Sequence, residues 1–158
     1  MHVDPYEKFW IFAAGAMIGG FLAAMVYSAS VHAVHPPSHI ETIDPLTVRT
    51  SSEFANPRVE VQEDGSLLVI GVAEMFRFLP TDLRLPAGEP VRFRLTSPDV
   101  LHGFQIVGTN ANVMVIPGYV SEFTVTIPKA GEYLVLCNEY CGLSHHLMQG
   151  RILVEDRP

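Results

Sequence analysis

The sequence predicts an all-β domain, a sandwich or barrel, preceded by one N-terminal transmembrane helix. Three observations support this fold class. The first forty residues are apolar and almost uncharged, whereas the remainder has the mixed composition of a water-soluble domain. Short runs rich in Val, Ile, Phe and Leu then recur between turn signals, which is typical of sandwiches and barrels. Beyond residue 40 the sequence shows no helical period.

The apolar segment runs from Phe9 to Ala29, and no charged residue occurs between Lys8 and Glu41. That length is sufficient to span a bilayer. A cleaved signal peptide is the alternative, but it would have a shorter apolar region and a basic start. Asp4, Glu7 and Lys8 give no positive excess. We therefore expect a retained membrane anchor over residues 1–35.

Small residues follow one face of this expected helix, where Gly15, Gly19 and Ala23 recur every four positions. Such a face allows another helix to approach closely, which predicts a larger membrane partner. Small residues are also common in any membrane helix. The few flanking charges leave the orientation undetermined by the positive-inside rule.

The stretch from Val34 to Pro57 contains four prolines and little apolar periodicity. These features predict a linker over residues 36–57 and a soluble domain over residues 58–158. Within the domain we expect strands over eight ranges: 59–62, 66–72, 90–95, 104–107, 112–116, 119–127, 132–137 and 151–154.

The charge balance excludes one class of partner. The formal net charge is -7 and the sequence has neither a basic patch nor a glycine-rich phosphate loop. Because nucleic acid is bound mainly through its phosphates, an acidic chain of this kind is not expected to bind it.

Both cysteines of the chain lie in one short segment, Cys137-Asn-Glu-Tyr-Cys141-Gly-Leu-Ser-His145-His146-Leu-Met148. Two thiolates, an imidazole and a thioether form a soft to borderline ligand set that suits copper. Two alternatives remain. A disulfide would leave the spacing of the histidine and methionine unexplained, and zinc would take two Cys and two His without a methionine.

A site built from one loop needs a further ligand, and His102 in Ser97-Pro98-Asp99-Val100-Leu101-His102-Gly103-Phe104 is the candidate. A remote histidine followed by a cysteine loop is similar to the order found in cupredoxins, which implies a cupredoxin-like Greek-key sandwich. A mononuclear blue copper site needs only one cysteine. Cys137 and Cys141 would instead allow both thiolates to bridge two copper ions.

The pattern Cys-x-Glu-x-Cys-x3-His-x2-Met, with Asp-Val-x-His-Gly-Phe upstream, resembles the CuA motif of cytochrome c oxidase subunit II. The resemblance implies six ligands for two copper ions: His102 and Met148, the bridging thiolates of Cys137 and Cys141, and His145 with the backbone carbonyl of Glu139. The first two would complete one copper and the last two the other. His146 competes with His145, but the family spacing selects His145.

The resemblance also implies the function. Such a subunit accepts electrons from cytochrome c and passes them to the haems of subunit I, so that oxygen is reduced to water elsewhere in the complex. The single helix is more similar to the compact ba3-type oxidases than to aa3-type subunits. Expected partners are subunit I, cytochrome c and the lipid membrane, and the complex could include a small accessory subunit. The expected location is the cell membrane, with a cytoplasmic N-terminus and a periplasmic copper domain.

One departure from the family pattern and one expected hydrogen bond refine this expectation. Where larger subunits have a tryptophan-rich segment that receives electrons, this chain has Met75-Phe76-Arg77-Phe78, and the two Phe would either line the electron-accepting surface or belong to the core. Asp99 is expected to hydrogen-bond His102 from outside the ligand set, or simply to serve the turn after Pro98.

Three other functions share parts of this pattern. Nitrous oxide reductase carries the same copper motif, but after a large catalytic domain that is absent from this sequence. Quinol oxidase subunit II has the fold and the anchor without the ligands. A cupredoxin-type, membrane-anchored copper-binding or copper-delivery protein is the alternative without an enzymatic complex.

Overall fold

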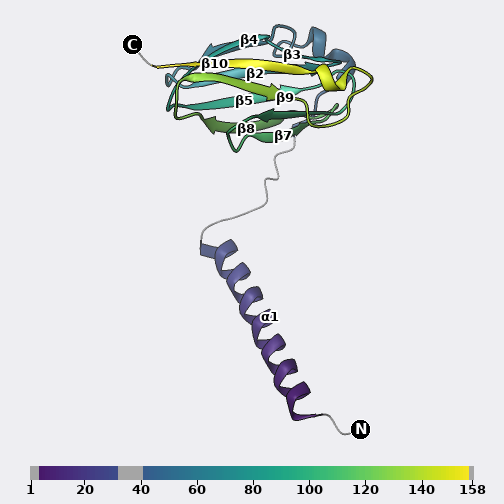
Figure 1. The fold of residues 1–158 in the computed structure, drawn as a ribbon, viewed down its shortest axis with the longest axis vertical. Coiled ribbons are helices and arrows are strands. Elements are labelled where there is room, and N and C mark those ends of the chain that lie inside the picture. The colour runs from purple at the N-terminus through teal and green to yellow at the C-terminus, as the bar shows by residue number, and fades with distance from the viewer. Residues whose placement is uncertain (1–3, 32–40, 157–158) are drawn as a thin grey trace. The chain divides into compact units, whose positions relative to one another are not determined.

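The computed structural model describes residues 4–31 and 41–156, which belong to two separate units. The first unit contains α1 (Pro5–Val31), a continuous helix drawn in purple in Figure 1. In the described residues α1 is the one helix long and apolar enough to cross a membrane, over Pro5–Ser30. This agrees with the expected N-terminal apolar helix.

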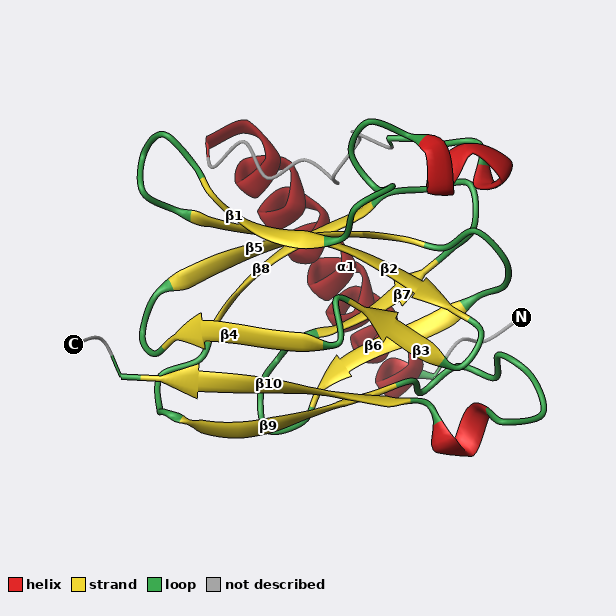
Figure 2. Cartoon of the chain, turned by 90° about the horizontal axis from the view of Figure 1, so that it is seen from above, coloured by secondary structure: helices red, strands yellow, loops and turns green. Residues whose placement is uncertain are grey.

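The second unit is a sandwich of two five-stranded sheets, seen as two layers in Figure 2. One sheet contains β1 (Arg58–Val61), β2 (Leu67–Glu74), β5 (Pro90–Thr96) and β8 (Ser121–Thr126) in that order, with β3 (Arg77–Leu79) paired to β2. The other follows the order β4 (Asp82–Pro86), β10 (Gln149–Glu155), β9 (Gly131–Leu136), β6 (His102–Ile106) and β7 (Asn112–Val115). The predicted all-β fold class is confirmed.

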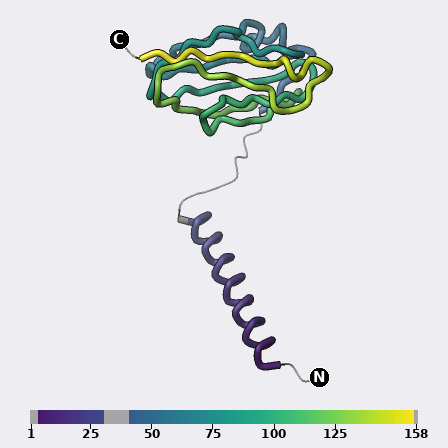
Figure 3. The backbone as a smooth tube through the Cα atoms, in the orientation of Figure 1, coloured from purple at the N-terminus to yellow at the C-terminus, as the bar shows by residue number. Residues whose placement is uncertain are grey.

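Most strand pairs are antiparallel, but β2 pairs with β5 and β4 with β10 in parallel. The tube in Figure 3 shows the yellow C-terminal strand running along the domain beside earlier parts of the chain. All eight predicted strands are present with shifted ends, whereas β3 and β4 were not predicted. Both are short and bounded by turns or Pro residues, so their local pattern is weak.

The core lies between the sheets and is centred on phenylalanines. Phe93 is fully buried and stacks on Phe123 at a ring distance of 5.0 Å. Phe78 is also buried and meets the edge of Phe104 at 5.3 Å. Aromatic pairs of this kind add to the stability from burial. Phe78 is therefore a core residue, and the interpretation that it lines an electron-accepting surface is wrong.

The structure differs from the expected linker over residues 36–57. Residues 32–40 lie outside the described part, but from residue 41 onward the chain is packed onto the domain. The short 3-10 helix η1 (Pro45–Thr50) carries Val48, which is fully buried, and Phe54 is 2% exposed. Both pack against β2 residues Leu68 and Ile70. The described part of this segment, which includes Pro45 at the start of η1, therefore belongs to the folded domain.

Arg94 on β5 ties this segment to the sheet. Its side chain is only 15% exposed and forms ion pairs of 2.7 Å with Glu41, 2.6 Å with Glu53 and 2.7 Å with Glu122. These hydrogen bonds, that to Glu53 first, hold the pKa of Arg94 above its ordinary value. Glu41 and Glu53 belong to the packed segment, so Arg94 fixes it to β5 and β8.

Candidate metal centre

Three of the six predicted ligands lie at the ends of strands. His102 is the first residue of β6, Cys137 follows the last residue of β9, and Met148 precedes β10. Because β6 pairs with β9 and β9 with β10, these strand ends are neighbours in one sheet. The remaining ligands lie in the loop between β9 and β10, which includes the 3-10 helix η2 (His145–Leu147).

The structure brings all six predicted residues together around two sulfur atoms. The Sγ atoms of Cys137 and Cys141 are 3.8 Å apart. The other donors lie within 4 Å of one sulfur or the other: the Glu139 carbonyl at 3.2 Å and His102 Nδ1 at 3.9 Å from Cys137, and Met148 Sδ at 3.5 Å and His145 Nδ1 at 3.7 Å from Cys141. His146 is exposed, so the geometry favours His145 over its neighbour.

The cluster is dry. His102 is fully buried, and Cys137, Cys141 and Met148 are 7%, 3% and 2% exposed. Both cysteines are free thiols, and their sulfurs are far beyond the separation of about 2.05 Å in a disulfide. Burial first, and then the hydrogen-bond interaction with Cys137, raises the pKa of the Cys141 thiol to about 11. A metal bound at this sulfur must therefore displace a proton.

The chemistry of the donors fits copper better than zinc. Two thiols, a thioether, two imidazoles and a carbonyl are more donors than one tetrahedral zinc takes. Thiolate and thioether groups are also the soft ligands that select copper. The ligand atoms of His102, Cys137 and Cys141 all lie within 4.8 Å of one another. The residues present therefore fit a copper centre, and their number fits two ions.

Asp99 makes the predicted contact with a ligand. Its Oδ1 accepts a hydrogen bond of 2.9 Å from Nε2 of His102. With the proton on Nε2, Nδ1 presents its lone pair toward Cys137 and any bound metal. Burial alone would raise the pKa of Asp99, but hydrogen bonds from His102 and from the backbone of Met75 and Val100 hold it below its ordinary value.

Sequence reasoning missed several neighbours of the site. Tyr140, between the two cysteines, is 73% exposed and its ring lies 5.8 Å from that of His145. Nδ2 of Asn138 donates 3.0 Å to Oδ1 of Asn112 at the start of β7. An ideal Cβ built on Gly142 would lie 3.2 Å from the ring of Phe76. Tyr140 lies inside the motif and was visible, whereas the other contacts join residues far apart in sequence.

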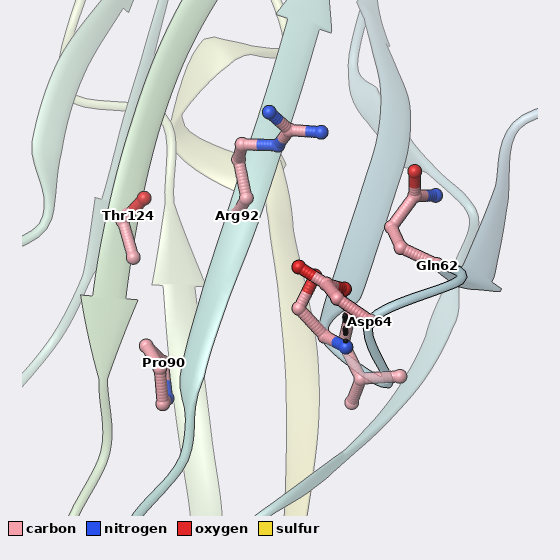
Figure 4. Close-up of a pocket in the computed structure, with 7 residues that line it drawn as sticks. Gln62, Asp64, Pro90, Arg92 and Thr124 are labelled. Carbon is pink, nitrogen blue, oxygen red and sulfur yellow. Dashed lines mark hydrogen bonds between the residues drawn. The ribbon is translucent and has the colours of Figure 1, made fainter.

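Figure 4 shows a surface pocket at the start of β2, at the end of the strand away from Met75. It is lined by Gln62, Asp64, Ser66, Leu67, Pro90, Arg92 and Thr124. Asp64 there accepts hydrogen bonds from the backbone and hydroxyl of Ser66. None of the six predicted ligands lines this pocket, and Asp64 and Ser66 stabilise the turn between β1 and β2. It adds nothing to the metal centre.

Comparisons with known proteins agree with the site. Residues 62–156 match the family model of the cytochrome c oxidase subunit II periplasmic domain. Over 155 residues the chain is 40% identical to a cytochrome c oxidase subunit 2 of Thermus thermophilus, covering 96% of this chain and 92% of that protein. A stretch of 74 residues, 47% of this chain and 27% of that protein, is 40% identical to the alternative cytochrome c oxidase subunit 2 of Bradyrhizobium diazoefficiens.

Solved structures show the same likeness. A chain of a haem-copper terminal oxidase dimer superposes with a TM-score of 0.67 and 31% identity, covering 95% of this chain and 99% of that one. The periplasmic domain of subunit II of the Bradyrhizobium japonicum cytochrome oxidase shares the fold, with a TM-score of 0.53 and 18% identity over 63% of this chain and 87% of that one.

The sandwich and its sulfur-rich loop define a cupredoxin-like domain with a CuA-type donor set, carried behind an apolar helix. The chain belongs to the family of cytochrome c oxidase subunit II. Membership makes it part of a haem-copper oxidase complex and favours that function over the alternative of a membrane-anchored copper-delivery protein.

Proposed function

We propose that this subunit accepts electrons from cytochrome c at a binuclear copper centre and passes them to the haems of subunit I for the reduction of oxygen to water. The proposed ligands are His102, Cys137, the Glu139 carbonyl, Cys141, His145 and Met148. In this function the chain carries electrons into the complex and performs no oxygen chemistry of its own.

The convergence of four further donors on the two cysteine sulfur atoms, which are 3.8 Å apart, carries the proposal. The donors form two sets: His102 and the Glu139 carbonyl around Cys137, and His145 and Met148 around Cys141. The family pattern takes one donor from each set for each copper. Each copper would then lie between the two sulfur atoms, within reach of a donor near Cys137 and a donor near Cys141. This arrangement supports two metals bridged by both thiolates.

When bound, a bridged copper pair supplies a one-electron carrier whose charge is shared by both metals. The residues of the chain hold the donors in place. Cys137 donates its backbone N–H to the carbonyl of Met148 at 3.3 Å, so the two ends of the loop are tied together. Burial of the thiolates and the thioether excludes water from the donors. A rigid, dry donor set changes little on reduction, which favours fast electron transfer.

The test is to load the full-length chain with copper in detergent and record its copper content, absorption and electron paramagnetic resonance spectra. We expect two coppers per chain and a purple, mixed-valence signal with one unpaired electron shared by both nuclei. A zinc-loaded sample is the colourless control. Binding of a single copper with a mononuclear signal, or preference for zinc, would overturn the proposal.

Exposed apolar side chains on the loop between β9 and β10, called the copper loop below, support contact with a protein partner. Tyr140, Leu143 and Leu147 are 73%, 89% and 67% exposed. Clustered exposed apolar residues commonly mark interaction surfaces. The half-buried His145 lies among them, so a partner at this surface would approach a proposed copper ligand directly. This is what electron transfer between proteins requires.

The proposed topology places the N-terminus in the cytoplasm and the copper domain in the periplasm, because cytochrome c lies outside the bacterial cytoplasmic membrane. The apolar helix α1 would remain uncleaved as a single-pass anchor. Protease added to intact spheroplasts should remove the domain and leave α1 in the membrane. Protection of the domain would reverse the topology and exclude cytochrome c as the donor.

A further inference from the structure

The carboxylate of Asp99 joins a proposed copper ligand to a distant hairpin. Its Oδ1 accepts from Nε2 of His102 at 2.9 Å, and its Oδ2 accepts from the backbone N–H of Met75 at 2.6 Å. Met75 lies in the turn between β2 and β3, 24 residues before Asp99. Two further donors, the Ser97 hydroxyl and the Val100 N–H, fix the carboxylate on its own turn. The carboxylate is thus held in place and links two separate segments.

The same turn lies against the copper loop. An ideal Cβ at Gly142, next to Cys141, would approach Phe76 Cε1 to 3.2 Å and Met75 Sδ to 3.8 Å. A side chain at position 142 would therefore push against the Phe76 ring. Gly142 itself has a φ of +134°, which favours glycine. The Met75–Phe76 turn thus rests almost directly on the loop beside one of the two sulfurs.

Phe76 keeps this position at a conformational cost. Its φ is 81°, and among the described residues it is the only residue other than glycine with a positive φ. A bulky residue in the left-handed region is strained and persists only where its surroundings impose it. Its ring is half-buried against the core cluster that includes both cysteines. The fold therefore holds the Phe76 ring beside the loop although the backbone there is strained.

We propose that Asp99 is a positioning residue that clasps the Met75–Phe76 turn over the copper loop, so that the turn covers the metal centre and retains the copper. The inference rests on the proposed function. One carboxylate oxygen orients His102 while the other holds the cover, so movement of the cover and displacement of the ligand are coupled through a single side chain. The cover shields the Cys141 side of the centre from water and from competing ligands.

Asp99→Asn tests the clasp, because an amide of the same shape has only one oxygen. Two donors, His102 Nε2–H and Met75 N–H, face the two carboxylate oxygens, so the amide nitrogen must oppose one of them. Phe76→Ala removes the cover without altering Asp99. Asp64→Asn is the matched control, because it removes the same charge from a carboxylate that accepts a backbone N–H at the other end of β2.

Full-length chains loaded with copper would be mixed with excess chelator, and copper release would be followed by loss of the visible spectrum. We expect Asp99→Asn and Phe76→Ala each to release copper about ten- to hundredfold faster than the parent chain, in the range found for outer partners of metal ligands. Asp64→Asn should match the parent. The double variant should release copper no faster than the faster single variant, because both changes open one cover.

The result is decided by the pattern of rates. Unchanged release from both single variants, or effects that multiply in the double variant, would overturn the cover. A changed spectrum in Asp99→Asn with parental release rates would also overturn it, because Asp99 would then act on His102 alone. The parent chain separates this inference from the proposed function, since failure of the parent to bind two coppers contradicts the function and not the clasp.

Discussion

An aspartate near each end of β2 accepts backbone hydrogen bonds in a loop, yet only one of the two belongs to the candidate site. Asp64 bonds Ser66, two residues away, and stabilises its own turn. Asp99 bonds Met75 and His102 and thereby joins segments that are distant in sequence. The residue type is the same at both ends. The long-range partners distinguish the site from the turn.

The surroundings differ in the same way. The surface pocket in Figure 4, at the Asp64 end, is lined by both polar and apolar residues. At the other end two thiols, an imidazole and a thioether are buried together. Burial of polar and ionisable groups is costly unless they are paired or bind a metal. The copper end is therefore where changes in a single side chain should have large effects.

Cys137→Ser or Cys141→Ser should have the largest effect, because each thiolate is proposed to bridge both metals. We expect loss of the two-copper centre while the sandwich remains folded. Metal analysis and the absorption spectrum of the full-length variants would show it. A Ser variant with two coppers and the parental spectrum contradicts bridging, and Asp64→Asn should keep both coppers.

Proton displacement should give the next largest effect. Because burial raises the pKa of Cys141 to about 11, this thiol is protonated at neutral pH in the metal-free protein. Copper binding to it releases one proton, so the apparent affinity should rise by about tenfold per pH unit below the pKa for this thiol alone. Titrations against a competing chelator between about pH 6 and 8 would measure the slope. A flat profile would show that Cys141 binds no metal as the thiolate.

Met148→Leu should have a smaller effect at the same end. Met148 is 2% exposed, and leucine has a similar volume, so packing should be preserved. A weak thioether ligand tunes the reduction potential more than it retains the metal. We expect both coppers to remain and the potential to shift, as measured by redox titration. Complete loss of copper would make Met148 an essential ligand.

Arg94→Gln should leave the copper spectrum unchanged and lower only the stability of the scaffold. It would leave Glu41, Glu53 and Glu122 close together without their shared cation. Because Arg94 is mostly buried, we expect a loss of about 1–2 kcal/mol in the free energy of unfolding. Arg84→Gln, which removes the exposed pair with Glu155, should cost less than about 0.5 kcal/mol. Equal losses of unfolding free energy for the two variants, measured by urea unfolding, would show that Arg94 does not fix this segment to β5 and β8.

Much of the fold followed from local patterns. Val91, Phe93 and Leu95 alternate with Arg92 and Arg94, and the structure buries the first three in the core. The pattern failed where burial depends on distant partners. Leu83 and Leu85 are buried because β4 pairs with β10, which lies far later in the sequence. The same reason applies to Val48 and Phe54, which looked like parts of a linker.

The candidate site was predictable to a different depth for each residue. Side-chain chemistry indicated Cys137, Cys141, Met148 and one of the two adjacent histidines, and the family spacing then selected His145 over His146. Glu139 is placed near Cys137 through its backbone carbonyl, and the residue type carries no information about such a contact. Its inclusion depended on the family resemblance. The positive φ of Phe76 has no signature in the sequence at all.

The position of β10 sets an order of events during biosynthesis. This last strand begins directly after Met148 and joins β4 to β9 within one sheet. His102 and Cys137 are separated by 35 residues, and the loop between β9 and β10 is anchored at both ends only once β10 has docked. Contacts between residues so far apart in sequence carry an entropic cost of loop closure, which the complete sandwich offsets. The proposed donors therefore converge only in the folded domain, and we expect copper to bind to the domain after β10 has docked.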